Sequence, residues 1–171
     1  MKKELQSLPC APYHKSYIAL VDQYPSVVDA LKETLRETKE LLSGIDESKA
    51  SSAYAPGKWT IKELILHLSD AERIFCNRAL RFARMDETGL PGFDHDEYVK
   101  NSSADARSFE SILAEFNAVR LATIALFEGF TPEMLEQTGK ANDALVSVLA
   151  IGYIAAGHEK HHVNVIRERY L

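Results

Sequence analysis

Hydrophobic residues recur along most of this chain at intervals of three and four positions, which is the period of an α-helix. No segment shows the strict alternation of hydrophobic and polar residues that is typical of a half-buried strand. We therefore predict an all-α protein. The helical pattern covers four long segments: about 25–42, about 60–84, about 104–128, and from 142 or 143 to about 169.

The predicted helix boundaries rest on residues that start and stop helices. Thr60 and Glu63 form the S/T-x-x-E pattern of a capping box, in which each side chain accepts a hydrogen bond from a free backbone N–H of the other residue. Pro25 suits a first helical turn, and Thr131 followed by proline predicts a short helical turn. Asn142 or Asp143 would cap the last helix.

Four helices with one hydrophobic stripe each bury those stripes most simply in a four-helix bundle. The connections before the second and third helices are long enough to cross the bundle, so the helix order is left open by periodicity. The loop at about 85–104 is rich in acidic and aromatic residues and longer than a minimal connection, which is typical of a functional cover. We predict a single domain over 1–171, with an N-terminal extension at 1–22 that the pattern does not assign.

Composition narrows the class of protein. The chain has 171 residues, of which 46% are hydrophobic, enough for one core without disulfide bonds. Its formal net charge is −5 and it has no run of lysines or arginines, which argues against nucleic acid as a partner. No apolar run reaches about 18 residues, so we expect no membrane span. Cys10 and Cys76 are too few for a disulfide framework, and we expect a cytoplasmic protein.

The sequence HEKHH places three histidines near the end of the last predicted helix. Residues four positions apart project from one helix face, so His158 and His162 can bind one ion together. Both fall within the hydrophobic stripe of this helix, whereas His161 lies about 60° outside it. We therefore predict that His158 and His162 face the core and that His161 does not take part.

A third ligand is expected from the second predicted helix, where His67 lies within the buried stripe. A single core-facing histidine is more often a hydrogen-bonded core residue, so a metal site is predicted from the three histidines together. Three imidazoles with an open fourth position are typical of a catalytic zinc site. We expect His14 and His95 at the surface, with His95 as the reserve ligand.

HEKHH also matches H-E-x-x-H, the metalloprotease pattern in which the glutamate acts as a general base. Known versions of that pattern have a third ligand downstream. Only nine residues follow His162, and none is a histidine. We therefore set the protease interpretation aside, although Glu159 remains a candidate base near the pocket.

Three stretches give the chain a family resemblance: KWTIKELILHLSDAE at 58–72, LPGFDHDEYV at 90–99 and GHEKHHVNVIRERY at 157–170. With them the sequence resembles the DinB/YfiT-like family. The resemblance implies a four-helix bundle with non-sequential helix order, pairing into homodimers, and a three-histidine metal site at His67, His158 and His162. The family includes S-transferases and isomerases that use bacillithiol or mycothiol, and many members described as metal-dependent hydrolases.

Three functions follow as hypotheses, each with a small-molecule substrate or none. In the first, one divalent ion binds a low-molecular-weight thiol as its thiolate, and Arg78 and Arg120 contact the anionic cosubstrate. In the second, the ion activates water for hydrolysis, with Asp70 or Glu159 as the base. Asp70 would suit the orientation of an imidazole better. The third is a non-catalytic metal-binding dimer.

Three neutral nitrogens do not select one metal. We predict zinc first, with nickel, iron or manganese as alternatives.

Overall fold

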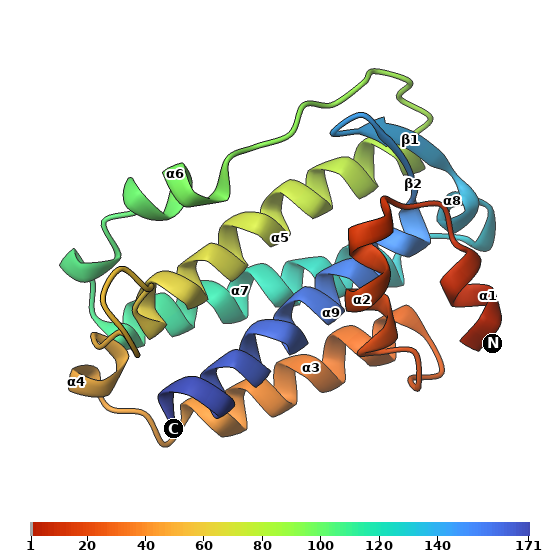
Figure 1. Ribbon diagram of the computed structural model, residues 1–171. Coiled ribbons are helices and arrows are strands. Elements are labelled where there is room, and N and C mark those ends of the chain that lie inside the picture. Colours follow the sequence, from red (N-terminus) through yellow and green to blue (C-terminus); the bar gives the residue numbers. More distant parts are fainter. Residues whose placement is uncertain (1) are drawn as a thin grey trace.

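Four long helices form the body of the protein, in a computed structural model that describes residues 2–171 (Figure 1). They are α3 (Val27–Leu42), α5 (Ile61–Ala83), α7 (Phe109–Glu128) and α9 (Val148–Val165). The last of them continues into a π-helical turn at Ile166–Tyr170. The four helices correspond to the four predicted segments, and the all-α prediction is confirmed.

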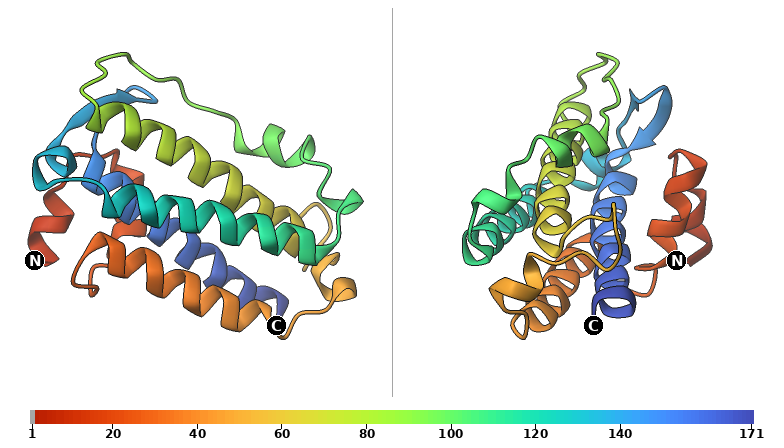
Figure 2. Two further views of the ribbon diagram at one scale, coloured as in Figure 1. Left: turned by 180° about the vertical axis from the view of Figure 1, so that it is seen from behind. Right: turned by 60° about the vertical axis from the view of Figure 1, so that its left-hand side comes forward.

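The helices do not follow one another around the bundle. Both α3 and α5 pack against α7 and α9, so the consecutive helices α3 and α5 lie diagonally opposite each other. Helices α3 and α9 run in one direction and α5 and α7 in the other (Figures 1 and 2). The helix order implied by the family resemblance is therefore present.

The parallel pair α5 and α7 needs a long crossover, which residues 84–108 provide by running back along α5 (Figure 1). This segment contains α6 (His95–Lys100) and a 3-10 turn at Ala104–Ala106. The predicted start of the third helix at Ala104 is wrong. Ser103 has a φ of 55°, and Ser108 is the N-cap of α7, accepting a hydrogen bond of 3.2 Å from the Ser111 N–H.

Capping decides where the other helices begin. The predicted capping box at the start of α5 is confirmed, with the Glu63 N–H donating to Thr60 Oγ1 at 3.1 Å and the Thr60 N–H donating to Glu63 Oε2 at 2.7 Å. Helix α3 begins at Val27 because Ser26 caps it, slightly later than the prediction from Pro25. The predicted short turn after Thr131 is α8 (Pro132–Glu136).

A β-hairpin replaces the predicted start of the last helix. Strands β1 (Thr138–Ala141) and β2 (Ala144–Ser147) pair antiparallel, which corrects the expectation of a protein without strands. Asn142 and Asp143 form the turn with φ values of 49° and 60°, the left-handed backbone of a tight hairpin turn. They are not helix caps. Ser147 caps α9 instead, accepting a hydrogen bond of 3.1 Å from the Ala150 N–H.

The N-terminal segment, unassigned by the sequence pattern, packs across α9. It contains α1 (Lys2–Ser7), a 3-10 turn at Pro12–His14, and α2 (Lys15–Ala19), which lies beside α9 in both figures. Ile18 and Val21 are fully buried. A Cβ on Gly157 would lie 2.1 Å from the carbonyl oxygen of Tyr17, so glycine permits this close crossing.

One short helix remains to be placed. Helix α4 (Glu47–Ala50) lies in the connection between α3 and α5. Within the part of the chain described, no helix has the length and apolar character needed to cross a lipid bilayer.

Candidate metal centre

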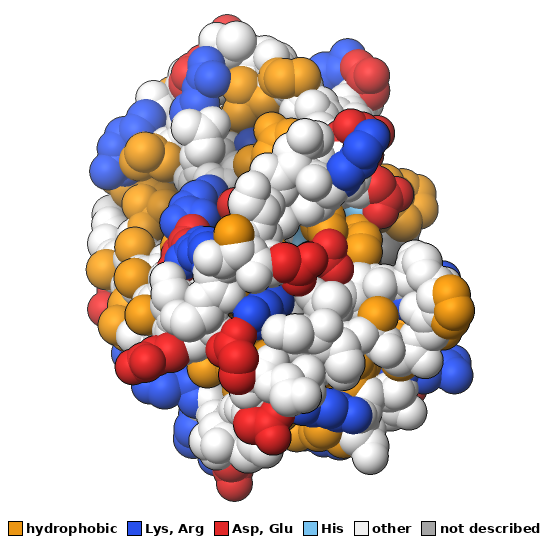
Figure 3. Space-filling view, turned by 90° about the vertical axis from the view of Figure 1, so that its left-hand side faces the viewer, with side chains coloured by type: hydrophobic (Ala, Val, Ile, Leu, Met, Phe, Trp, Pro, Cys, Tyr) orange, Lys and Arg blue, Asp and Glu red, His pale blue; other side chains and the backbone are white. Residues whose placement is uncertain are grey.

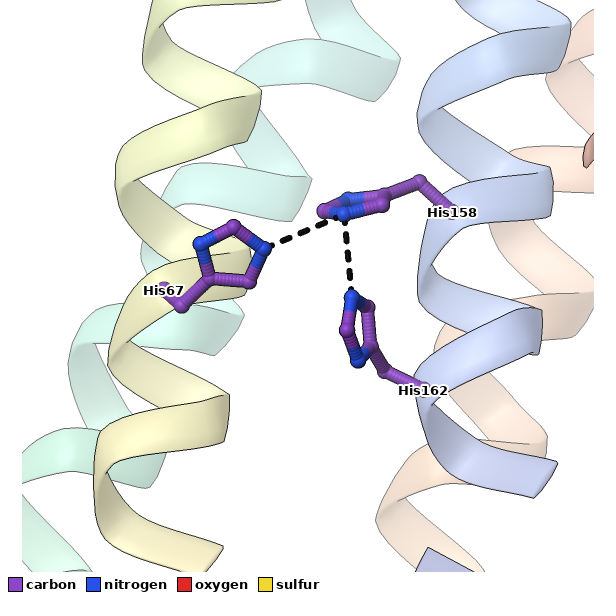
Figure 4. Close-up of side chains that lie close together, drawn as sticks. All are labelled: His67, His158 and His162. Carbon is purple, nitrogen blue, oxygen red and sulfur yellow. Dashed lines mark hydrogen bonds between the residues drawn. The ribbon is translucent and has the colours of Figure 1, made fainter. Parts of the chain in front are cut away.

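The three predicted metal ligands meet between α5 and α9. His67 projects from α5 toward His158 and His162, which lie one turn apart on α9 (Figure 4). His158 Nε2 lies 3.2 Å from His67 Nε2 and 3.1 Å from His162 Nε2. The ligand atoms of all three fall within 4.8 Å of one another. The three histidines therefore lie together as the sequence predicts, and their role as metal ligands stays a prediction.

Hydrogen bonding among the rings does not account for this arrangement. One imidazole nitrogen offers either one proton or one lone pair, yet His158 Nε2 has two ring nitrogens as close neighbours. A tetrahedral ion with Zn–N bonds of about 2.0–2.1 Å places its nitrogen ligands about 3.3 Å apart. The two separations from His158 Nε2 are close to that value, so the cluster suits a divalent metal ion.

Burial keeps the three imidazoles neutral at neutral pH. It lowers the pKa of His67 from 6.5 to about 4, with His95 adding a smaller effect of the same sign. Burial and then His67 lower the pKa of His162 to about 3. Burial likewise places the pKa of His158 well below its usual value. Each neutral ring therefore has one nitrogen whose lone pair can bind a metal without the loss of a proton.

A cavity of about 490 Å³ opens onto the histidines. One face of α5 supplies His67, Ala71, Phe75 and Arg78, which are spaced by three or four positions as one side of a helix requires. The other lining residues come from the N-terminal segment, the connection before α5, the crossover, the hairpin turn and α9: Tyr13, His14, Tyr17, Trp59, Gly92, Phe93, His95, Asn142, His158 and His162. The loop predicted as a functional cover therefore forms part of the wall.

Both histidines that we expected at the surface line this cavity. His14 is half-buried and its Nδ1 atom is buried without a hydrogen-bond partner among the described residues. Burial and the nearby Arg78 lower its pKa to about 4. His95 has a largely exposed side chain, yet its ring centroid is 5.9 Å from that of His67. The surface assignment is wrong for His14 and holds only in part for His95.

Of the two arginines predicted to contact a cosubstrate, one lines the cavity and the other does not. Arg78 lines the cavity and donates a 2.8 Å hydrogen bond to the carbonyl oxygen of Pro91. Arg120 is fully buried away from the cavity, where its guanidinium binds both carboxylate oxygens of Glu72 at 2.7 and 2.6 Å and also pairs with Glu159. A guanidinium enclosed in this way has no surface for a ligand, which corrects the predicted role of Arg120.

The two predicted carboxylate bases also lie outside the cavity lining. Glu159 is buried and accepts hydrogen bonds from Arg120 and, at 2.6 Å, from Thr38 Oγ1. Asp70 accepts a 3.3 Å hydrogen bond from Arg73 on its own helix. Neither carboxylate contacts one of the three imidazoles. This corrects the predicted role of both residues as proton-accepting bases, and that of Asp70 in orienting an imidazole. His161 lies outside the cluster of His67, His158 and His162, as predicted.

A second hollow of about 260 Å³ also has His162 in its wall. Its lining includes Trp59, Tyr170 and the exposed carboxylate of Asp96 on α6. Figure 3, which views the molecule from the end with α4, shows histidine in a hollow among hydrophobic and acidic side chains. His162 thus lines both hollows, and Asp96 brings a carboxylate to the wall of the second one.

Apart from the loop that contains His95, the sequence pattern missed the cavity residues outside the four helices. His14 and Tyr17 belong to a segment without long periodicity, and their approach depends on the crossing of α2 over α9 at Gly157. Trp59 directly precedes the capping box of α5, and its ring centroid lies 5.0 Å from that of His67. The glycine inside a helical segment was the one available signal of a close backbone approach.

The fold and the histidine cluster define a four-helix-bundle protein with a site suited to a divalent metal. A sequence model of the DinB superfamily matches residues 30–166, and the chain belongs to that superfamily. Two relatives carry the name "Putative metal-dependent hydrolase". One, from Geobacillus kaustophilus, is 25% identical over 83% of this chain and 79% of its own. The other, from Oceanobacillus iheyensis, is 24% identical over 75% of this chain and 74% of its own.

Two solved structures share the fold. YfiT from Bacillus subtilis, described as a probable metal-dependent hydrolase with an unusual four-helix bundle topology, matches with a TM-score of 0.71 and 17% identity. The match covers 83% of this chain and 82% of YfiT. A mycothiol-dependent maleylpyruvate isomerase matches with a TM-score of 0.68 and 11% identity, over 81% of this chain and 58% of the isomerase.

Proposed function

We propose that this protein is a metal-dependent enzyme that joins a low-molecular-weight thiol to a small electrophile. The observation that carries the proposal is the convergence of three neutral Nε2 atoms at the wall of a cavity that also contains Arg78. A bound divalent ion would act as a Lewis acid, favouring the deprotonated form of a thiol or of water at its free position.

The chain's own residues suit a thiol better than water on the main cavity side. Aromatic rings of Tyr17, Trp59 and Phe75 line that side and exclude solvent from a reacting sulfur. Among the described lining residues of the main cavity there is no carboxylate to accept a proton from water. Arg78 supplies a positive charge, which suits the anionic groups of a cellular thiol.

In the proposed reaction the thiolate sulfur attacks an electrophilic carbon. A C–S bond forms while the bond to the leaving group breaks, and the leaving group departs with the bonding electron pair. The thiol proton passes to solvent before the attack. The three histidines hold the ion, and the cavity walls orient the electrophile toward the sulfur.

The test is conjugation of thiols to a model electrophile by protein purified without a nickel column. Elemental analysis would give the bound metal, and 1-chloro-2,4-dinitrobenzene with cysteine, glutathione, bacillithiol or mycothiol would give the rate. We expect metal-dependent acceleration that is lost in His67→Ala and kept in His161→Ala, the matched control in the same motif as two of the ligands. The thiol proposal fails if no thiol reacts faster with the metal-loaded protein.

Hydrolysis is the second candidate. The names of the two relatives favour it, and Asp96 in the second hollow is a carboxylate near His162. In that case Asp96, rather than Asp70 or Glu159, would accept the proton from water. An ester and amide panel should then show metal-dependent turnover that Asp96→Asn lowers and that the neighbouring exposed Glu97→Gln leaves unchanged.

We keep zinc as the expected metal, with nickel, iron or manganese as alternatives, and we expect a cytoplasmic homodimer. The exposed apolar groove between α5 and α7, with Ala118, Ala122 and Leu126 in its wall, is consistent with a dimer contact. Light scattering of the purified protein would test the dimer. If the metal site exists without any turnover, the non-catalytic metal-binding alternative replaces both enzyme proposals.

A further inference from the structure

Arg78 is a buried cation without a matching anion. The residue is only 8% exposed, and burial lowers the pKa of its guanidinium. Its side chain donates to the carbonyl oxygen of Pro91, and no carboxylate of the described residues forms an ion pair with it. Buried charges in proteins are normally paired, as Arg120 is in this same bundle. Arg78 therefore leaves room for an anion from outside the chain.

His14 provides a second unsatisfied group at the same place. Its Nδ1 atom is buried and has no hydrogen-bond partner within the described part of the chain. His14 and Arg78 line the same end of this cavity, because both also line a smaller pocket beside it. In the tautomer with hydrogen on Nδ1, the ring can donate to an anionic oxygen.

Three separate segments enclose this end of the cavity. Tyr13 lies in the N-terminal segment, and Asn142 Nδ2 in the hairpin turn approaches its hydroxyl oxygen at 3.4 Å. Gly92 of the crossover lies so close to Asn142 that an added Cβ would be 2.3 Å from its Oδ1. All three residues line the cavity. The walls around Arg78 and His14 are therefore built by tertiary packing and do not belong to one flexible loop.

The distance from the histidines sets the shape of a ligand. His67 and Arg78 lie three turns apart on α5, which corresponds to roughly 16 Å between their Cα atoms, shortened by the reach of both side chains. Phe75 lies between them, with its ring centroid 5.8 Å from that of His158. A molecule that reaches both ends must be elongated and apolar in the middle.

We propose that Arg78 and His14 form an anion subsite, which binds the carboxylate or phosphate of an elongated organic acid whose other end reacts at the histidines. This substrate class rests on the proposed function, because the reacting end is placed by the metal. The apolar middle of the molecule would lie against Phe75 and Trp59. The acid could belong to the thiol or to the electrophile, and the subsite recognises the same chemistry in either.

Trp59 makes the subsite measurable because it is the single tryptophan of the chain and lines the cavity. We would titrate its fluorescence with benzoate, phenyl phosphate and uncharged benzamide, in zinc-loaded and in chelator-treated protein. Benzoate or phenyl phosphate should bind with and without zinc, and benzamide should bind far more weakly. The stronger of the two anions identifies the acid group that the subsite prefers.

Variants separate the subsite from the metal. Arg78→Met should weaken anion binding roughly tenfold or more, Arg78→Lys less, and His14→Ala by several fold. Arg81→Met is the matched control, because Arg81 is on the same helix, pairs with Asp86 and does not line this cavity. Circular dichroism would confirm that each variant is folded.

The outcomes distinguish the two proposals. Equal anion binding by the wild type and Arg78→Met would overturn the subsite, and so would anion binding that requires zinc and is lost in His67→Ala. Zinc binding and thiol conjugation without Arg78-dependent anion binding would leave the proposed function standing and remove the subsite. Arg78-dependent anion binding in a protein that takes up no metal would leave the subsite standing and remove the proposed function.

Discussion

Two buried polar clusters diverge from consecutive residues of α9. His158 faces α5 and meets His67 and His162, whereas Glu159, about 100° further around the helix, faces α3 and α7 and pairs with Arg120. Both clusters are formed by side chains from different helices, and both His158 and Glu159 are nearly inaccessible to solvent. Burial alone therefore does not tell a ligand site from a structural one.

The difference lies in how far each cluster satisfies itself. The Arg120 guanidinium donates to Glu72, Glu159, Thr34 Oγ1 at 2.9 Å and the carbonyl oxygen of Leu31 at 3.2 Å. The histidine cluster has three nitrogens directed at one another and too few protons to join them. We call the Arg120 cluster closed, because its polar groups satisfy one another, and such a network stabilises the fold. We call the histidine cluster open, because its nitrogens need a ligand to be satisfied.

The largest expected effect is the loss of the closed network in Arg120→Met. Without the guanidinium, Glu72 and Glu159 remain buried as carboxylates close together, and we expect the free energy of unfolding to fall by about 3–5 kcal/mol. Urea unfolding followed by circular dichroism would measure it. Arg73→Met is the control, since the pairs of Arg73 are partly exposed and should contribute no more than about 1 kcal/mol. Similar losses in both variants would contradict the comparison.

Removal of the metal should test the open cluster. At a free zinc concentration about a thousand times the dissociation constant, binding stabilises the folded state by about 4 kcal/mol. Thermal unfolding of the wild type should therefore shift upward with zinc and return with a chelator. His67→Ala should lose this shift, whereas His161→Ala should keep it. A zinc effect of equal size in His67→Ala would show that zinc binds elsewhere.

The pH dependence of the metal-free protein should separate the clusters further. The folded-state pKa of His67 is lowered to about 4, so below about pH 6.5 the unfolded chain binds the proton first. The stability contributed by the neutral ring is present above pH 6.5 and is lost as the pH falls toward 4. For His67 this loss approaches about 3 kcal/mol. Urea unfolding at pH 7, 5.5 and 4.5 would measure the free energy of unfolding, which should fall less with decreasing pH in His67→Ala than in the wild type. An equal fall in both proteins would contradict this prediction.

Helical periodicity predicted the long helices and the convergence of the three histidines for the same physical reason. The directions of His67, His158 and His162 depend only on the helix repeat and on which helix face is hydrophobic. Both can be determined from neighbouring residues in the sequence. The capping box at Thr60 is equally local. These are the features that the structure reproduces.

Features that depend on tertiary contacts were predicted poorly. Arg120 and Glu159 face the core, as a helical repeat can tell, but the repeat does not show that they face each other across the bundle. Asn142 and Asp143 suit both helix caps and left-handed turns, and only the pairing of β1 with β2 decides between them. His14 reaches the cavity because α2 crosses α9, which no local pattern reveals.

The smallest expected effect sharpens the division between the two clusters. Thr38→Val keeps the shape of the side chain and removes its 2.6 Å hydrogen bond to Glu159, so unfolding should become easier by about 1–2 kcal/mol. Zinc affinity should stay unchanged, although Glu159 is the sequence neighbour of His158, because the two side chains contact different helices. Calorimetric zinc titration of Thr38→Val beside the wild type would measure this. A clear fall in affinity would mean that Glu159 positions His158 and that the two clusters act as one.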